Sequence, residues 1–213
     1  MKDHSATFIT DEALYLIGFC LRPDEDAADV WILMSSGGDL DRPIVAEKKI
    51  VFFTTPALAL SALTLADNDL KRLALAPEEE ALICDVPGML DLIGTANVDE
   101  TATISNCLNT FFDLLRAVKQ PLPSDYKRML YAFADHLTFH QEFGAFLAAQ
   151  QIDRAQLREA VEWCLETIFA RSKLLSLQNW TKTALRKTAK PKRTTGIQKR
   201  RNLSKKQEMA VVR

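Results

Sequence analysis

The order of apolar and polar positions in the first part of the chain predicts a β-sheet. Three apolar stretches, residues 13–22, 29–36 and 49–55, are rich in Val, Ile, Phe, Tyr and Trp, the side chains that fit the pleated surface of a strand. The segments between them, residues 23–28 and 37–48, carry the Gly, Pro and Asp residues of turns. The pattern therefore predicts an antiparallel meander of at least three strands.

A helix is predicted directly after the third stretch. Thr55 can cap it with its hydroxyl group, and Pro56 suits the first position because its missing N–H would have no partner there. The apolar residues 57–66 continue the helix to Asp67. We expect this helix to cover one face of the sheet.

Residues 77–94 combine a helix signal with a motif that also occurs in nucleotide-binding proteins. Three glutamates follow Pro77, an arrangement that stabilises a first helical turn, so residues 81–84 are predicted to be helical and residues 85–88 to be a turn between two helices. An apolar run that ends in Asp-x-x-Gly can also present a magnesium-binding carboxylate, but the glycine-rich, lysine-containing phosphate loop that accompanies it is missing from this sequence. We therefore expect no nucleotide site at Asp85.

From Glu100 onward, apolar residues recur at intervals of three and four, which is typical of helices. We predict one helix to residue 118 and a second from Tyr126 to about Ala149, with Ser124 as its cap and a break near Thr138 or Gly144. A third begins with Asp153 as its cap. Three helices joined by short linkers pack as an antiparallel group.

The helical pattern ends after Leu177, and the segment that follows is strongly basic. Residues 180–213 hold 12 Lys and Arg against one Asp or Glu, which leaves 15 against 27 for residues 1–179, so the net charges are +11 and −12. Dense like charge with few large apolar residues predicts disorder from about Lys182. The predicted fold class is α+β: an N-terminal antiparallel sheet with a covering helix (residues 1–98), a helical C-terminal half (residues 99–177) and a disordered basic tail (residues 178–213).

The tail predicts a partner that carries phosphate groups. Clustered Lys and Arg side chains on a flexible backbone neutralise phosphates and gain free energy from counterion release without a fixed geometry. An anionic membrane is a weaker alternative, since the tail has few bulky apolar residues that could enter it. The expected nucleic-acid contacts are Arg186, Lys187, Lys190, Lys192, Arg193, Lys199, Arg200, Arg201, Lys205 and Lys206.

The cysteines and two of the histidines are the residues that could bind a metal ion or react. The four cysteines are far apart in the sequence and form no Cys-x-x-Cys pair, so we expect buried thiols and neither disulfides nor a zinc site. His136 and His140 stand four residues apart and would share one face of a continuous helix, the spacing of a metal-binding pair. No motif selects a third ligand, so we expect two packed or partly exposed histidines, no cofactor and no assignable catalytic residue.

These observations predict a non-enzymatic, cytoplasmic interaction protein. No apolar run reaches the roughly 18 residues that a membrane-spanning helix needs, and the N-terminal residues include acids where a signal peptide has an apolar core. The basic tail is expected to bind nucleic acid or a ribonucleoprotein non-specifically, while the acidic body binds a protein partner. The alternative is a small metal-dependent enzyme that uses His136 and His140.

Overall fold

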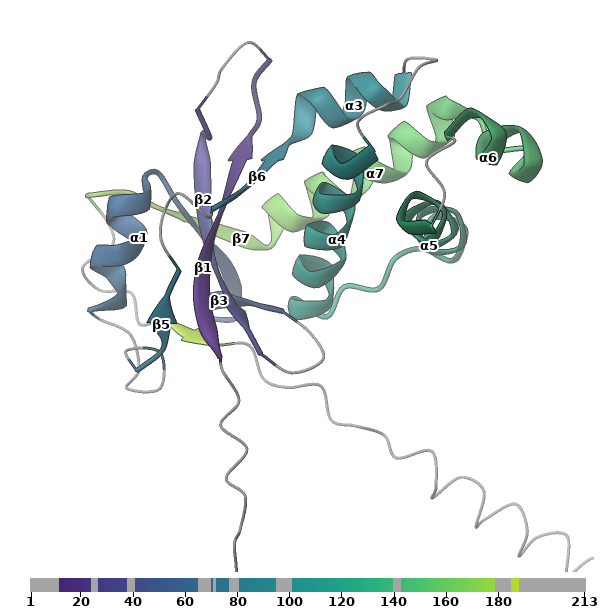
Figure 1. Ribbon diagram of the computed structural model, residues 1–213. Coiled ribbons are helices and arrows are strands. Elements are labelled where there is room, and N and C mark those ends of the chain that lie inside the picture. Colours follow the sequence, from purple (N-terminus) through teal and green to yellow (C-terminus); the bar gives the residue numbers. More distant parts are fainter. Residues whose placement is uncertain are drawn as a thin grey trace, which may run out of the picture.

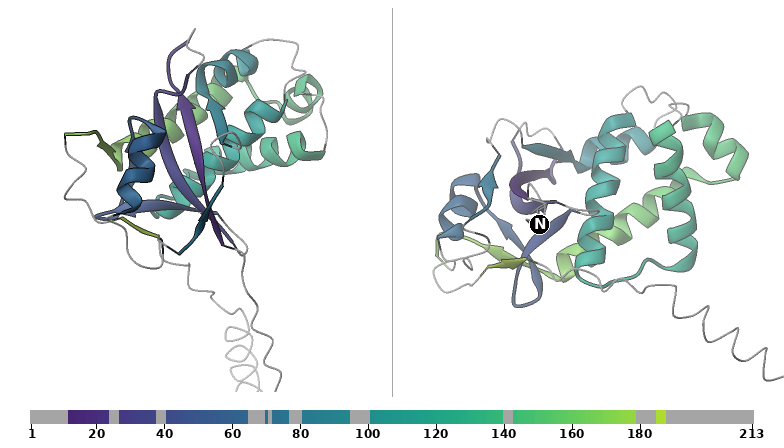
Figure 2. Two further views of the ribbon diagram at one scale, coloured as in Figure 1. Left: turned by 60° about the vertical axis from the view of Figure 1, so that its left-hand side comes forward. Right: turned by 60° about the horizontal axis from the view of Figure 1, so that its bottom comes forward.

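The protein has an eight-stranded sheet with helices on both faces, which confirms the predicted α+β fold class. The computed structural model describes residues 12–23, 27–37, 41–64, 70, 72–76, 81–94, 101–139, 143–178 and 185–187. Figures 1 and 2 show helix α1 on one side of the sheet and helices α3, α4 and α7 on the other. Helices α5 and α6 lie farther from the sheet in these views.

The three strands that the hydrophobic pattern predicts are present and antiparallel. Strand β1 (Ala13–Cys20) pairs with β2 (Val30–Ser36) along almost its whole length, from Ala13 opposite Ser36 to Phe19 opposite Val30. Strand β4 (Lys49–Phe53) meets β2 where Phe53 lies opposite Trp31. The meander is therefore formed as expected, with a further strand inserted into it.

Five short strands extend this meander beyond the prediction. Strand β3 lies in the segment that was expected to be a linker, and it joins β2 to β4. Two strands pair parallel with β1, one pairs parallel with β4, and one pairs antiparallel with β3. The five additional strands are β3 (Arg42–Ala46), β5 (Ala74–Leu75), β6 (Leu82–Asp85), β7 (Ser172–Leu175) and β8 (Arg186–Lys187).

The prediction of a helix at residues 81–84 and a helix-to-helix turn after it is wrong. Residues 82–85 form strand β6, which pairs with β1 so that Cys84 lies opposite Phe19. Helix α3 (Val86–Gly94) starts directly after it. The Asp85 carboxylate caps this helix, since Oδ1 accepts a hydrogen bond from the Gly88 N–H at 3.0 Å. Pairing with a buried strand therefore outweighs the local helix signal of the preceding glutamates.

The other helices follow the sequence pattern closely. Helix α1 (Pro56–Leu63) begins with Thr55, whose Oγ1 accepts a hydrogen bond from the Leu58 N–H at 3.1 Å. It ends before the predicted end at Asp67, which lies outside the described residues. The helical half contains α4 (Thr101–Ala117), α5 (Ser124–Phe139), α6 (Phe143–Gln150) and α7 (Arg154–Ala170). Asp153 caps α7 as predicted. Thr138 and Gly144, near which a break was predicted, lie within α5 and α6, and residues 140–142 between these helices lie outside the described residues.

The core consists of two apolar layers on opposite faces of the sheet. Alternate strand residues such as Ile17, Phe19 and Phe52 pack against α3, α4, α5 and α7 in the larger layer. Their sequence neighbours, such as Leu16 and Val51, pack with α1 in the smaller one. Because both faces are covered, the strands are almost continuously apolar.

The end of the described chain corrects the prediction of disorder at residues 185–187 only. Leu185 is fully buried in the smaller core layer, and Arg186 and Lys187 pair with Val45 and Ile44 of β3. One buried leucine and one strand pairing hold this short segment within an otherwise polar sequence. Residues 179–184 and 188–213 lie outside the described residues.

Candidate nucleic-acid interface

Residues 185–187 of the basic segment have a defined place on the sheet. Of the ten side chains predicted to contact nucleic acid, Arg186 and Lys187 belong to β8, whose backbone pairs with β3. The other eight lie outside the described residues: Lys190, Lys192, Arg193, Lys199, Arg200, Arg201, Lys205 and Lys206. Strand β8 therefore lies beside β3, the strand that leads into the turn before β4.

That turn carries basic side chains which the sequence analysis did not select. Lys48 and Lys49 at the turn are exposed, and so is Arg171 at the end of α7. Together with Glu47, Val118 and Ala170 these three side chains line a hollow of about 440 Å³. Lys173, at the start of β7, pairs with Glu47 through Nζ and Oε2 at 3.4 Å. We call Lys48, Lys49, Arg171 and Lys173 the basic corner.

Pairing between distant segments fixes the basic corner. Strand β4 lies parallel to β7 with Ile50 opposite Ser172, and the Ile50 N–H donates a hydrogen bond to the Arg171 carbonyl at 3.2 Å. The side chains of Lys49 and Arg171 therefore start from adjacent backbone positions. In the described part of the chain, no salt bridge involves Lys48, Lys49 or Arg171.

The turn between β3 and β4 adopts a conformation that usually requires glycine or asparagine. Glu47 and Lys48 have φ angles of 53° and 66°, as both central residues do in the tight hairpin turn that matches strand twist. For residues with a Cβ, the left-handed conformation costs roughly 1–2 kcal/mol each. The pairing of β3 with β4 maintains this strained turn, which presents Lys48 at its tip.

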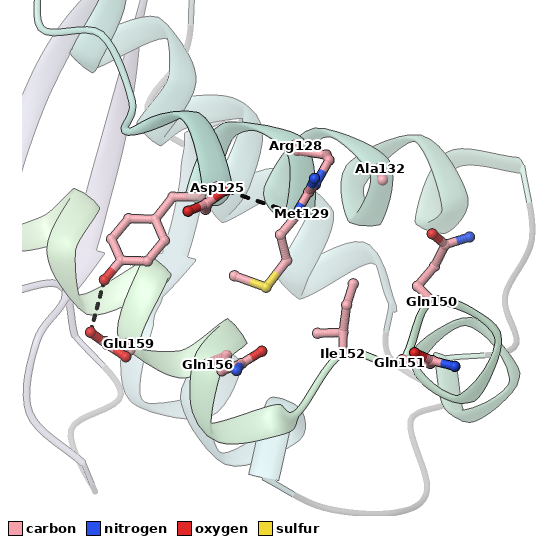
Figure 3. A pocket seen from close by; sticks show the side chains of 10 residues that line it. Asp125, Arg128, Met129, Ala132, Gln150, Gln151, Ile152, Gln156 and Glu159 are labelled. Carbon is pink, nitrogen blue, oxygen red and sulfur yellow. Dashed lines mark hydrogen bonds and ion pairs between the residues drawn. The ribbon is translucent and has the colours of Figure 1, made fainter.

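A second surface depression lies in the helical half, far from β8 in the sequence. It encloses about 570 Å³ between α5, the start of α7 and the loop before it. Figure 3 shows Met129 and Ile152 pointing into this groove, with Gln150, Gln151 and Gln156 around it. At one end, the Tyr126 hydroxyl donates a hydrogen bond to Glu159 Oε1 at 2.8 Å. The groove thus has an apolar floor and a rim of amide and carboxylate groups.

The two histidines do not form a described pair. His136 is half-buried on α5, and its ring stacks on Phe146 of α6 with centroids 4.8 Å apart. His140 lies outside the described residues, directly after Phe139, the last residue of α5, so the structure does not test the predicted pair. Among the described residues, no group of three or more His, Cys, Asp or Glu side chains is arranged to hold a metal ion.

The cysteines are buried free thiols, as predicted. The Cys84 thiol lies 3.6 Å from Thr110 Oγ1, and that of Cys107 lies 3.8 Å from the Asp85 carbonyl oxygen. A hydrogen bond between the side chains of Cys84 and Cys107, together with burial, raises the pKa of Cys107. Burial raises the pKa of Cys164 to about 12. Because a thiolate is the reactive form, these two groups are poor nucleophiles at neutral pH.

Comparison with known proteins yields a distant structural likeness and no family. No protein-family model and no curated protein matches the chain. Among solved structures, it is similar to the C-terminal domain of SatS, crystallised in complex with bromine. The TM-score is 0.49 at 14% sequence identity, over 78% of this chain and 94% of that domain. No conclusion about ligands or activity follows from a likeness at this level.

The basic tail is visible in the sequence, but the basic corner is not, for a physical reason. The dipeptide Lys48-Lys49 is visible in the sequence, but Arg171 and Lys173 reach it only through the parallel pairing of β4 with β7. No local pattern announces that pairing, because parallel neighbours are joined by long connections. The one available signal is a charged dipeptide at a turn between two apolar strands.

Proposed function

We propose that this chain is a non-enzymatic interaction protein of the cytoplasm that binds nucleic acid or a ribonucleoprotein through its basic C-terminal segment. The observation that carries the proposal is the separation of charge: residues 180–213 have a net charge of +11 and residues 1–179 a net charge of −12. Such a basic segment neutralises backbone phosphates without reading the base sequence. In the described part of the chain, no helix is both long and apolar enough to span a membrane.

The anchoring of β8 supports a role for the segment within the whole molecule. Leu185 is buried and β8 pairs with β3, so the basic residues that follow Lys187 in the sequence start beside the body. A nucleic acid bound there is held next to the sheet. Binding by the segment therefore brings the nucleic acid close to whatever the body binds.

The acidic body is proposed to bind a protein partner, and the groove in the helical half is the site that suits one best. Its floor contains the half-buried side chains of Met129 and Ile152, which can take an apolar side chain of the partner. Gln150, Gln151 and Gln156 at the rim can both donate and accept hydrogen bonds. These groups match the backbone N–H and C=O of a peptide segment.

The test of nucleic-acid binding compares the full chain with a chain that ends at Lys187, which keeps Leu185 and β8. We expect the full chain to bind DNA and RNA of mixed sequence in a filter assay, with an affinity that falls steeply as salt rises, because each phosphate contact on duplex DNA contributes about 0.9 to the slope of log affinity against log salt. The shortened chain should show much weaker binding and a shallower slope. Equal retention of nucleic acid by both chains would refute the proposal.

A further inference from the structure

We infer that the basic corner is a second nucleic-acid contact, at which Lys48, Lys49 and Arg171 bind backbone phosphates at the end of β3, the strand that pairs with β8 of the basic segment. This inference rests on the proposed function, because it assigns part of the same nucleic acid to a site on the folded body. It goes beyond that function, because the corner is formed by residues outside the basic segment.

The position of the corner supports a shared ligand. Strand β8 pairs with β3 where Arg186 lies opposite Val45, and the turn that presents Lys48 begins at Glu47, directly after β3 ends at Ala46. Because β8 runs antiparallel to β3, Arg186 is the nearer of its two basic residues to this turn, and Lys187, opposite Ile44, lies one position farther away. A polynucleotide that contacts the basic segment at β8 can extend along β3 toward the turn and place a neighbouring phosphate in the hollow.

The charges of the described residues at the hollow favour an anion. Lys48, Lys49, Arg171 and Lys173 contribute four positive charges, and Glu47 removes one. The C-terminal ends of α4 and α7 border the hollow at Val118 and Ala170, and each helix end carries about half a negative charge. A surplus of roughly two positive charges remains. This surplus lies on a body whose net charge is −12.

The strained turn adds an independent indication of function. Lys48 occupies a left-handed conformation that glycine or asparagine adopts at lower cost. Strained backbone of this kind concentrates at ligand-binding sites, where the position of a side chain matters more than local stability. In this turn the strained position presents a lysine at the mouth of a basic hollow.

The shape of the surface favours nucleic acid over a lipid surface as the partner. Lys48, Lys49 and Arg171 converge around a hollow of about 440 Å³, which suits a phosphate group that projects from a chain. A bilayer presents its headgroups as a flat layer, and polybasic binding to it needs no hollow. The exposed Leu174 and Leu177 lie nearby in the sequence, so the experiment includes vesicles as a separate arm.

The test uses the full chain with Lys48, Lys49 and Arg171 all changed to Gln. A matched control changes Lys127, Arg128 and Arg158 to Gln, which removes the same charge from exposed positions on α5 and α7. Binding of a labelled DNA duplex of mixed sequence is measured by fluorescence anisotropy over a range of salt concentrations. We expect the slope of log affinity against log salt to fall by about 2–3 in the corner variant, at about 0.9 per lost contact. It should stay nearly unchanged in the control.

Each outcome decides one proposal. Equal slopes for the corner variant and its control would overturn the inference and leave the proposed role of the tail intact. Loss of binding in the chain that ends at Lys187 tests the tail alone, so the two proposals can fail separately. In the third arm, the full chain and the corner variant are sedimented with phosphatidylserine vesicles. If the corner variant lost vesicle binding while its DNA binding stayed equal to the control's, the corner would be a membrane contact and the inference would be wrong.

Discussion

Gly88 decides how helix α3 begins. A Cβ atom at this position would lie 2.1 Å from Asp85 Oδ2, so the capping carboxylate could not stay where it is. Changing Gly88 to Ala therefore removes a cap that is typically worth about 0.5–2 kcal/mol. Gly94 at the other end of α3 is the control, since a Cβ there meets nothing within 4 Å. We expect Gly88→Ala to be about 1–2 kcal/mol less stable than Gly94→Ala in urea denaturation; equal stabilities would show that the cap is unimportant.

Asp113 is expected to make the stability of the protein depend on pH. Burial raises the pKa of its carboxyl group in the folded state, although the Arg116 guanidinium lies 2.6 Å away and lowers it. Since an acid with a raised folded pKa favours the protonated form, ionised Asp113 destabilises the fold. That destabilisation is absent below the unfolded pKa of about 3.9 and grows as pH rises through the folded pKa.

Asp113→Asn should therefore raise the free energy of unfolding at neutral pH. We expect a gain of less than about 1 kcal/mol, because loss of the partly exposed pair with Arg116 offsets some of it. The gain should disappear when the two proteins are compared below about pH 4. A difference that stays constant from pH 4 to pH 7 would mean that the carboxyl group does not titrate abnormally.

Single residues could be predicted from sequence where their role is local. Thr55 and Asp153 cap α1 and α7 as expected, because a cap contacts backbone groups only two or three residues away. The role of Asp85 could not be predicted in the same way. Its carboxylate caps α3 only because β6 pairs with β1 and ends there.

At the scale of elements, β8 has only two residues, but a buried leucine next to it holds it on the sheet. Leu185, which precedes it, is fully buried, whereas Leu177 is 75% exposed. Leu185→Ala should cost about 2–5 kcal/mol by leaving a cavity in the smaller core layer. Leu177→Ala makes the same chemical change on the surface and should alter stability by no more than about 0.5 kcal/mol. Thermal melts of both variants measure the difference, and similar melting temperatures would show that Leu185 contributes little.

Elements were predicted well where a long stretch had one period. The strands at residues 13–20 and 30–36 and the helices of the C-terminal half match the hydrophobic pattern. Strand β3 was missed because Pro43 and the glycines and aspartates before it resemble a turn. Strands β7 and β8 were missed because two to four residues carry no period of their own, and each depends on a partner strand far away in the sequence.

At the scale of the whole molecule, one apolar layer joins the sheet to the helical half. Phe52 of β4 stacks on Phe169 of α7, and Phe19 of β1 stacks on Phe111 of α4. Sequence periodicity predicts such helices and strands separately, but it contains no information about which faces meet. The basic corner has the same origin, since it exists only where the last turn of α7 reaches the turn between β3 and β4.

The return of the chain to the sheet in β7 and β8 has a consequence during synthesis. Ile50 pairs with Ser172, and Val45 pairs with Arg186, so β3 and β4 leave the ribosome long before these neighbours are made. Contacts between such distant residues form slowly, and an unpaired strand can bind a strand of another growing chain. Until residues through Lys187 have emerged, we expect the nascent protein to depend on chaperones to keep these strand edges from aggregating.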